Sequence, residues 1–398
     1  MKRSVRPLTI VVVAAAMLTA ACSGGSEAAE DDPGAATSDV LTDDTPAPID
    51  EGSSSSPAPE DGKDGKDGKD GKDGKDDGKD GRPSTTDPAT TTTRQAGQST
   101  TTETLIPRVP LVGHVLADGQ TAPDRPALVV KIDNHPLARP QTGLNQADVV
   151  FEEIVEGSIT RFAAVFHSGN SNPVGPIRSG RTQDVDLLSG LNQPLFAWSG
   201  GNPGVTAAID NSDFISINAV RGGGGYYRTE RAAPHDLYNS TDSLYSQATP
   251  EAGRPDPLFR YVRPENEVGG ENTSWVDVLV GSNPVRWEWA PETGTYRRFQ
   301  SGSPHMQTDG QVTADNVVIL LTGYRPSSVD ARSPEAITVG EGYAFVFSDG
   351  TMQVGIWKRD DNRSPIDLRD PKGRRMLIAP GRTWVELADA NANTVETG

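Results

Sequence analysis

The chain of 398 residues contains a single cysteine, Cys22. The 376 residues that follow it contain none, so no disulfide bond can form within that part of the chain. Any fold beyond Cys22 must be stabilised by its hydrophobic core and its hydrogen bonds alone.

The sequence also lacks a block of positive charge. It has 37 Lys and Arg against 55 Asp and Glu, which gives a net charge of −18. Beyond residue 104 the 35 acidic and 26 basic side chains are interspersed. Because nucleic-acid binding needs clustered Lys and Arg, we expect no nucleic-acid partner.

A long membrane-spanning run is missing as well. The apolar stretch LTIVVVAAAMLTAA, Leu8 to Ala21, has 14 residues, whereas a spanning helix needs about 20. Lys2, Arg3 and Arg6 precede it, which is typical of an export signal. No Arg-Arg pair accompanies it, so we expect the general export route rather than the twin-arginine route.

The expected signal peptide, residues 1–22, ends in the sequence LTAAC. This ending resembles a lipobox, in which small residues admit the signal peptidase and the cysteine accepts a diacylglyceryl group. Thr19 departs from the pattern, since leucine is commonest there. We expect an acylated Cys22, palmitate included, that anchors the protein in membrane lipid on the extracytoplasmic face of the cell membrane. The alternative is an ordinary signal peptide cut nearby, which leaves a free thiol.

Residues 23–104 have almost no large apolar side chains and include the run DGKDGKDGKDGKDGKDDGKDGR. Such a segment cannot bury enough surface to offset the entropy of ordering it, so we expect a disordered linker. A collagen-like triple helix is disfavoured because the triplets contain no proline and Asp77 breaks their phase. The Thr-rich end, 84–104, resembles a glycosylated stalk but equally suits a plain polar spacer.

Residues 105–250 carry mixed strand and helix patterns, which predict an N-terminal α+β domain. Buried strands are expected in ALVVKIDN (127–134) and PLFAWSGG (194–201), and a hairpin in residues 147–168 that turns at Gly157. Helices are expected within 181–191, after Asn202, and within 234–248.

Residues 251–274 are rich in proline, glycine and charge and predict a connector. From 275 to 390, short alternating runs separated by glycine turns predict a mostly-β second domain, a small barrel or a curled sheet, followed by a tail at 391–398. Its expected strands begin with WVDVLV and end with RMLIA and TWVELA.

Several of these stretches together resemble the YerB-like family of bacterial lipoproteins. They are GLNQADVVFEEIVEGSITRFAAVFHS, VGPIRSGRTQDVDLL, RAAPHDLY, NVVILL, IWKR and LIAPGRTWVEL. They cover roughly 110–250 and 270–390 and occur in the family's order. The resemblance implies a lipid anchor and two domains of unknown function, and it implies no reaction.

Paired carboxylates occur in the first strand of the hairpin. Strand alternation would place Glu152 and Glu156 on one face with Ile154, and Glu153 on the other. Such carboxylates can perform acid–base chemistry on a sugar. The alternative is a solvated edge, or a salt bridge to Arg161 across the hairpin.

The segment PIRSGRTQD places Arg178 and Arg181 in a turn before an expected helix, with Ser179 or Thr182 as its cap. Arginine side chains at a helix N-terminus can bind a carboxylate or phosphate. The alternative is that both arginines pair internally with Glu152, Glu153 or Asp184.

Further along, RAAPHDLY supplies Arg231 and His235. His235 is a candidate ligand contact or base in the same site, and a structural, hydrogen-bonded histidine is the alternative. We expect no metal site, because the histidines at 114, 135, 167, 235 and 305 are scattered. We expect no cofactor, because the glycine-rich stretches lack a nucleotide-binding context. Trp287 and Trp289 suit either a sugar-stacking platform or core packing.

The favoured function is therefore a non-enzymatic binding or scaffolding role in the cell envelope, for an anionic cell-wall component or an envelope protein. Its candidate ligand contacts are Arg161, Arg178, Arg181, Arg231 and His235. The alternative is a cell-wall hydrolase or transferase that uses Glu152, Glu153, Asp184 and His235.

Overall fold

The structure, a computed structural model, describes residues 106–398. The expected signal peptide with Cys22 and the expected linker, residues 23–104, lie outside the described residues, so the expectations for them stay predictions.

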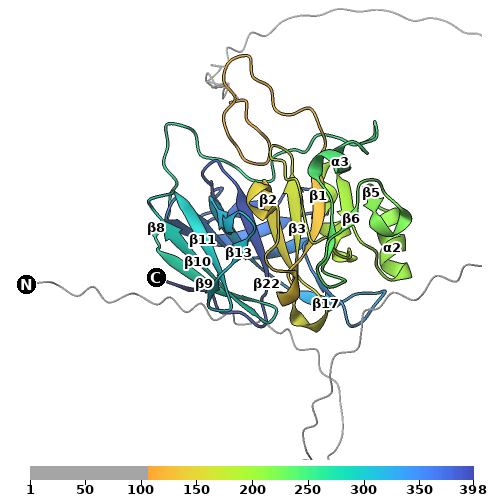
Figure 1. The fold of residues 1–398 in the computed structure, drawn as a ribbon. Helices are drawn as coiled ribbons and strands as arrows, with labels where there is room; N and C mark the ends of the chain where they lie inside the picture. Colours follow the sequence, from red (N-terminus) through yellow and green to blue (C-terminus); the bar gives the residue numbers. More distant parts are fainter. Residues whose placement is uncertain (1–105) are drawn as a thin grey trace, which may run out of the picture. The chain divides into compact units, whose positions relative to one another are not determined.

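An 11-stranded sheet runs through the described region in the order β21-β20-β19-β16-β22-β2-β3-β1-β4-β5, with β8 on β20. Its strands are β1 Leu128–Asp133, β2 Val149–Ile154, β3 Thr160–Phe166, β4 Leu195–Trp198, β5 Ile215–Asn218, β8 Glu271–Asn272, β16 Asn316–Thr322, β19 Gly340–Ser348, β20 Thr351–Arg359, β21 Asp367–Arg369 and β22 Thr383–Asp389. The two halves of the chain join where β2 lies parallel to β22, with Glu152 opposite Glu386 (Figure 1).

A second, six-stranded sheet packs against one face of the large sheet. Its strands are β9 Trp275–Val280, β10 Asn283–Ala290, β11 Thr295–Gln300, β12 Ser303–Pro304, β15 Thr313–Ala314 and β23 Glu396–Thr397. The core between the sheets includes Phe162, Trp287 and Trp384. Trp287 is fully buried and donates its indole N–H to Glu386 at 2.9 Å, so of the two alternatives for this ring the structure shows core packing.

Short helices and 3-10 turns pack against the large sheet. The α-helices are α1 Gln183–Leu188, α2 Pro203–Asp210 and α3 Thr241–Tyr245, and the 3-10 turns are η1 Pro136–Ala138, η2 Leu144–Gln146, η3 Glu156–Ser158, η4 Ser189–Leu191 and η5 Ala219–Arg221. Helices α1 and α2 lie on the face away from the second sheet, where a second core includes Phe196, Leu188 and Val385, whereas Leu244 of α3 belongs to the first core. Burial on both faces explains why strands such as β16 are apolar throughout rather than alternating.

Three two-stranded pairs complete the described elements. They are β6 Tyr227–Arg228 with β7 Leu237–Tyr238, β13 Met306–Gln307 with β14 Gly310–Gln311, and β17 Tyr324–Pro326 with β18 Pro334–Ala336.

Most sequence-based elements are confirmed. Strands β1 and β4, helices α1 and α2, and the hairpin of β2 and β3 lie where the patterns predict them. Gly157 adopts a φ of 68° in the turn of that hairpin, a conformation that suits glycine. The C-terminal half is mostly β, as expected.

One expectation for a single element is confirmed in part and another is wrong. The helix expected within 234–248 is present but spans only α3, because residues 237–238 pair as β7 with β6. Residues 375–379 form no strand but make isolated bridges, Arg375 to Arg369 and Ile378 to Tyr261. Met376 and Ile378 are nevertheless buried, so their apolar pattern reports core packing rather than pairing.

The strands after residue 275 do not close into a barrel of their own. β16, β19, β20 and β22 extend the sheet of the first half, whereas β9 to β12 form the second sheet. The described residues fall into one compact unit. Within residues 106–398 no helix is long and apolar enough to cross a membrane.

Candidate functional site

Three charged residues form a row across neighbouring strands of the large sheet. In the strand register Arg161 of β3 lies opposite Asp133 of β1 and opposite Glu153 of β2. Paired residues on adjacent strands share a face, so these side chains gather on one side of the sheet. All three are buried.

Glu153 belongs to a closed network. Lys131 lies two residues before Asp133 on the same face, and its Nζ is 2.8 Å from Glu153 Oε1 and 2.7 Å from Asp184 Oδ1. All three side chains are fully buried. Burial, together with the charge of Asp184, raises the pKa of Glu153 to about 8, so Glu153 is mostly protonated at neutral pH.

Asp133 holds His235 and Arg178. Its Oδ2 lies 2.6 Å from His235 Nδ1 and 3.1 Å from Arg178 Nε. Burial opposes its ionisation, but the hydrogen bond with His235 and the charge of Arg178 outweigh burial and lower the pKa of Asp133. An ionised carboxylate only accepts hydrogen bonds, so His235 donates from Nδ1 and keeps Nε2 for another partner.

Backbone pairing brings Arg178 to this place. Asp133 N donates to Pro176 O at 3.0 Å, and Arg178 N donates to Lys131 O at 2.9 Å. The segment PIRSGR therefore runs along the end of β1, which sets the Arg178 side chain beside Asp133.

His135 stacks on His235. Their ring centroids are 4.5 Å apart and their planes differ by 11°. Burial and the neighbouring His235 lower the pKa of His135, and its Nδ1 accepts a hydrogen bond from Leu137 N at 3.2 Å. His135 is therefore neutral and carries its proton on Nε2. The fold thus brings together two of the histidines that are scattered in the sequence.

Arg161 is the exceptional member of the cluster. It is 3% exposed, and its Nε is buried without a hydrogen-bond partner in the described part of the chain. Its one side-chain hydrogen bond is a long one, 3.4 Å from NH1 to Ser179 O. Burial and the charges of Arg181 and Arg178 lower the pKa of Arg161 to about 9.

Arg181 forms an ion pair with Glu156. Its Nε donates a hydrogen bond to the Glu156 carboxylate at 3.0 Å. Burial alone would raise the pKa of Glu156, but the contact with Arg181 outweighs burial and lowers it. The predicted alternation is wrong at Glu156, because β2 ends at Ile154 and the chain turns. Glu156 then lies on the side of Arg161, not with Glu152.

The Arg231 side chain has a structural role. Its guanidinium donates to the carbonyls of Ala138, Arg139 and Pro140 and to the hydroxyl of Tyr238. These bonds use its donors to hold the loop after His135. The structure thus separates Arg231 from the other predicted ligand contacts.

The predicted helix N-terminus is also not part of the site. Helix α1 has six residues, and its N-cap Thr182 makes no side-chain capping bond. The Thr182 hydroxyl instead bonds Ser327, at 2.8 Å, and Glu335.

Glu152 lies on the opposite face from Glu153. Its Oε2 is 2.5 Å from Arg298 NH2, and both side chains are fully buried between the two sheets. Glu386 lies next to it in the register, and burial and the Glu152 charge raise the pKa of Glu386 well above its usual value. Glu152 and Glu153 therefore lie on opposite faces of the large sheet and do not share one site.

Three members of these clusters were missed by the sequence analysis: Lys131, Asp133 and His135. A signal was present, because Lys131 and Asp133 are charged residues at alternate positions of an otherwise apolar strand. Among residues 106–398, no three His, Cys, Asp or Glu side chains form a group that could hold a metal ion.

Comparison with known proteins matches two domain models of one family. Residues 111–254 match the N-terminal domain of a protein of unknown function, DUF3048, and residues 276–385 match its C-terminal domain. The chain is 28% identical over 303 residues to "Putative lipoprotein YerB" of Bacillus subtilis (strain 168), covering 73% of this chain and 89% of that protein. The chain belongs to the YerB-like family.

The crystal structure of the YerB protein from Bacillus subtilis agrees with this assignment. It matches with a TM-score of 0.62 at 25% identity and covers 72% of this chain and 99% of that chain. Asp133, Arg161, Arg178 and His235 all lie inside the part that matches the N-terminal YerB-like domain model.

Proposed function

We propose that this YerB-like protein is a lipid-anchored binding protein of the cell envelope. Its N-terminal α+β half carries the site, where Arg161, Arg178 and His235 take an anionic group. The carboxylate or phosphate belongs to a cell-wall component or to an envelope protein.

The buried, unpaired guanidinium of Arg161 carries this proposal. Lys131, Arg178 and Arg181 each lie within ion-pair distance of at least one of the carboxylates Glu153, Asp184, Asp133 and Glu156, whereas Arg161 forms no ion pair with any residue between 106 and 398. Burying an unpaired charge costs folding free energy, so its retention favours a role in binding.

Binding is tested by thermal unfolding with phosphate, citrate, sugar phosphates and muropeptides as probes. A probe at about 100 times its Kd stabilises the folded state by about 2.7 kcal/mol. We expect at least one of these anions to raise the Tm of the wild type, and Arg161→Met to lose that response. Without ligand, Arg161→Met should be as stable as the wild type or more stable, because the buried charge is gone.

Arg221→Met is the matched control. Arg221 is exposed and pairs with Asp210 away from the cluster, so this variant should keep the wild-type response. A wild type that responds to no probe, or an Arg161→Met variant that responds like the wild type, would contradict the proposal.

The location rests on Cys22 and on the family of lipoproteins. We expect the mature protein to begin at a diacylated or triacylated Cys22 and to partition with membranes, whereas Cys22→Ala is released. Mass spectrometry of the N-terminal peptide checks this. An unmodified thiol there would remove the anchor from the proposal.

Acid–base chemistry at His235 is a second candidate, favoured by the 2.6 Å contact that orients its ring on Asp133. Analysis of the probe after incubation with the protein distinguishes binding from catalysis. A binding protein returns the probe unchanged, whereas conversion that disappears in His235→Asn would show an enzyme.

A further inference from the structure

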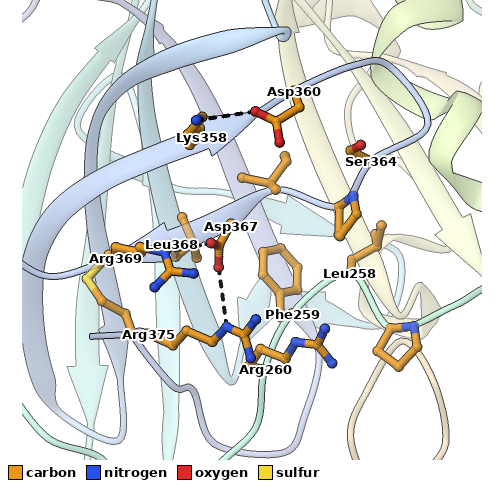
Figure 2. A pocket seen from close by; sticks show the side chains of 14 residues that line it. Leu258, Phe259, Arg260, Lys358, Asp360, Ser364, Asp367, Leu368, Arg369 and Arg375 are labelled. Atoms are coloured by element: carbon orange, nitrogen blue, oxygen red, sulfur yellow. Dashed lines mark hydrogen bonds and ion pairs between the residues drawn. The ribbon is translucent and has the colours of Figure 1, made fainter. Parts of the chain in front are cut away.

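A pocket of about 410 Å³ lies at the β21 edge of the large sheet and shares no residue with the Arg161 cluster. Three separate segments line it: residues 257–260 of the connector, residues between Lys358 and Arg369, and residues 375–376 (Figure 2). Its volume is within the range of about 300–1,000 Å³ that is typical of small-molecule sites.

One part of the pocket wall is apolar. Phe259, Leu368 and Met376 are nearly fully buried and belong to the core on this face of the sheet. Leu258 and Ile366 are half-buried beside them. Figure 2 shows the Phe259 ring in the middle of the lining residues. A short alkyl chain or an aromatic ring would lose water-exposed surface by packing here.

The rim carries more positive than negative charge. The lining contains four cations, Arg260, Lys358, Arg369 and Arg375, against two carboxylates, Asp360 and Asp367, an excess of two. Asp367 already accepts from Arg369 at 2.7 Å and lies 3.6 Å from Arg375. Asp360 lies 3.4 Å from Lys358.

Arg260 therefore has no acid left to pair with. It is exposed, and its guanidinium makes no hydrogen bond or ion pair with any residue between 106 and 398. In Figure 2 it lies on the same side of the pocket as Arg375, beside the Phe259 ring. An unpaired guanidinium next to an apolar wall suits a ligand with an anionic head and an apolar body.

We propose that this pocket binds a single-chain anionic amphiphile, with its carboxylate or phosphate on Arg260 and Arg375 and its apolar chain on Phe259 and Leu258. The site is independent of the proposed Arg161 site.

Methionine methyl NMR tests the proposal on the full chain, with decanoate, decyl phosphate, decanol and acetate as probes. Met376 lines this pocket, whereas Met352 lines a different pocket of about 360 Å³. We expect decanoate or decyl phosphate to shift the Met376 signal with one-site saturation. Decanol and acetate, which each lack one half of the ligand, should not do so at the same concentration. The tighter of the two anions identifies the head group.

Arg260→Ala should weaken binding about tenfold, as loss of one charge contact does. It should fold normally, because the side chain is exposed and unpaired. Arg254→Ala is the matched control in the same connector, since Arg254 is exposed and lies outside the pocket. Arg161→Met should also bind normally, which separates this site from the proposed function. The proposal is overturned by an unresponsive Met376, by a response at Met352 instead, by decanol binding as well as decanoate, or by wild-type affinity in Arg260→Ala.

Discussion

At the scale of single residues, the YerB-like protein buries charges on both faces of one sheet. Lys131, Glu153 and Asp184 satisfy one another on one face, and Glu152 with Arg298 on the other. Buried ion pairs contribute little net stability, yet removing one partner is costly. Arg161 differs from all of these because no carboxylate within the described part of the chain forms an ion pair with it.

Glu153 should make stability fall as pH rises. Its pKa is raised from 4.5 to about 8 in the folded state, so its stabilising contribution is complete below pH 4.5 and is lost as pH rises through about 8. Glu153→Gln does not titrate. We therefore expect the unfolding free energy of Glu153→Gln, relative to the wild type, to rise between pH 4.5 and 8, by up to about 1.4 kcal/mol per pH unit. Urea unfolding at a series of pH values measures this.

Glu156→Gln is a control in which the pH dependence of stability has the opposite sign. The folded-state pKa of Glu156 is lowered by Arg181, so the wild type gains stability above pH 4.5 and loses it on acidification. The unfolding free energy that Glu156→Gln loses relative to the wild type should therefore become smaller as the pH falls below 4.5. A pH-independent difference for Glu153→Gln would show that its pKa is not raised.

At the scale of elements, β2 connects the two sheets and the two halves of the chain. It pairs with β3 and β22, and its Glu152 reaches Arg298 on β11 of the smaller sheet. Arg298 also bonds Gln300 and His305 at 2.6 Å each. The contact between the sheets thus contains a polar network inside an apolar core.

Arg298→Met should destabilise the protein by about 3–5 kcal/mol, because Glu152 and Glu386 then remain buried together without a cation. The loss should be smaller at low pH, because the Glu386 carboxyl, whose pKa is raised by burial, is then protonated and adds no buried charge. Chemical denaturation at pH 5 and pH 8 checks this.

Arg286→Met removes a largely exposed ion pair with Asp277 on the same sheet and should cost about 1 kcal/mol or less. Equal losses in the two variants would mean that the buried network is not what holds the sheets together.

At the scale of the whole molecule, the halves that match two family models share one sheet. β22, from the end of the chain, lies between β2 and β16 and is parallel to both. Cutting the chain within 251–274 would leave β2 with an unpaired, apolar edge.

We therefore expect fragments 106–254 and 276–398, each expressed alone, to show no cooperative unfolding, whereas 106–398 unfolds in one transition. Calorimetry and amide proton spectra measure this. A fragment 106–254 with dispersed amide signals and its own cooperative transition would show that the first half folds independently.

Local patterns in the sequence were sufficient for most of the elements. Apolar runs bounded by turns located β1, β4, β16 and β22, and the Gly157 turn located the hairpin. Helix α3 was overestimated because Leu237 and Tyr238 pair with Arg228 and Tyr227, and because Leu237 O accepts a hydrogen bond from the distant Ile177 N at 2.7 Å. Propensity acts over a few residues, so it cannot detect a competing partner that is distant in the chain.

The sequence by itself determined that this chain has no disulfide after Cys22, that its C-terminal half is mostly β, and that Arg161, Arg178 and His235 are the residues to examine. Only the tertiary structure decided that Asp133 unites Arg178 and His235, that Glu152 meets Arg298 between the two sheets, and that Arg161 is buried without a counterion among residues 106–398. The reason is physical: strand periodicity is local, whereas charge pairing depends on which strands become neighbours, and in this sheet they come from distant parts of the chain.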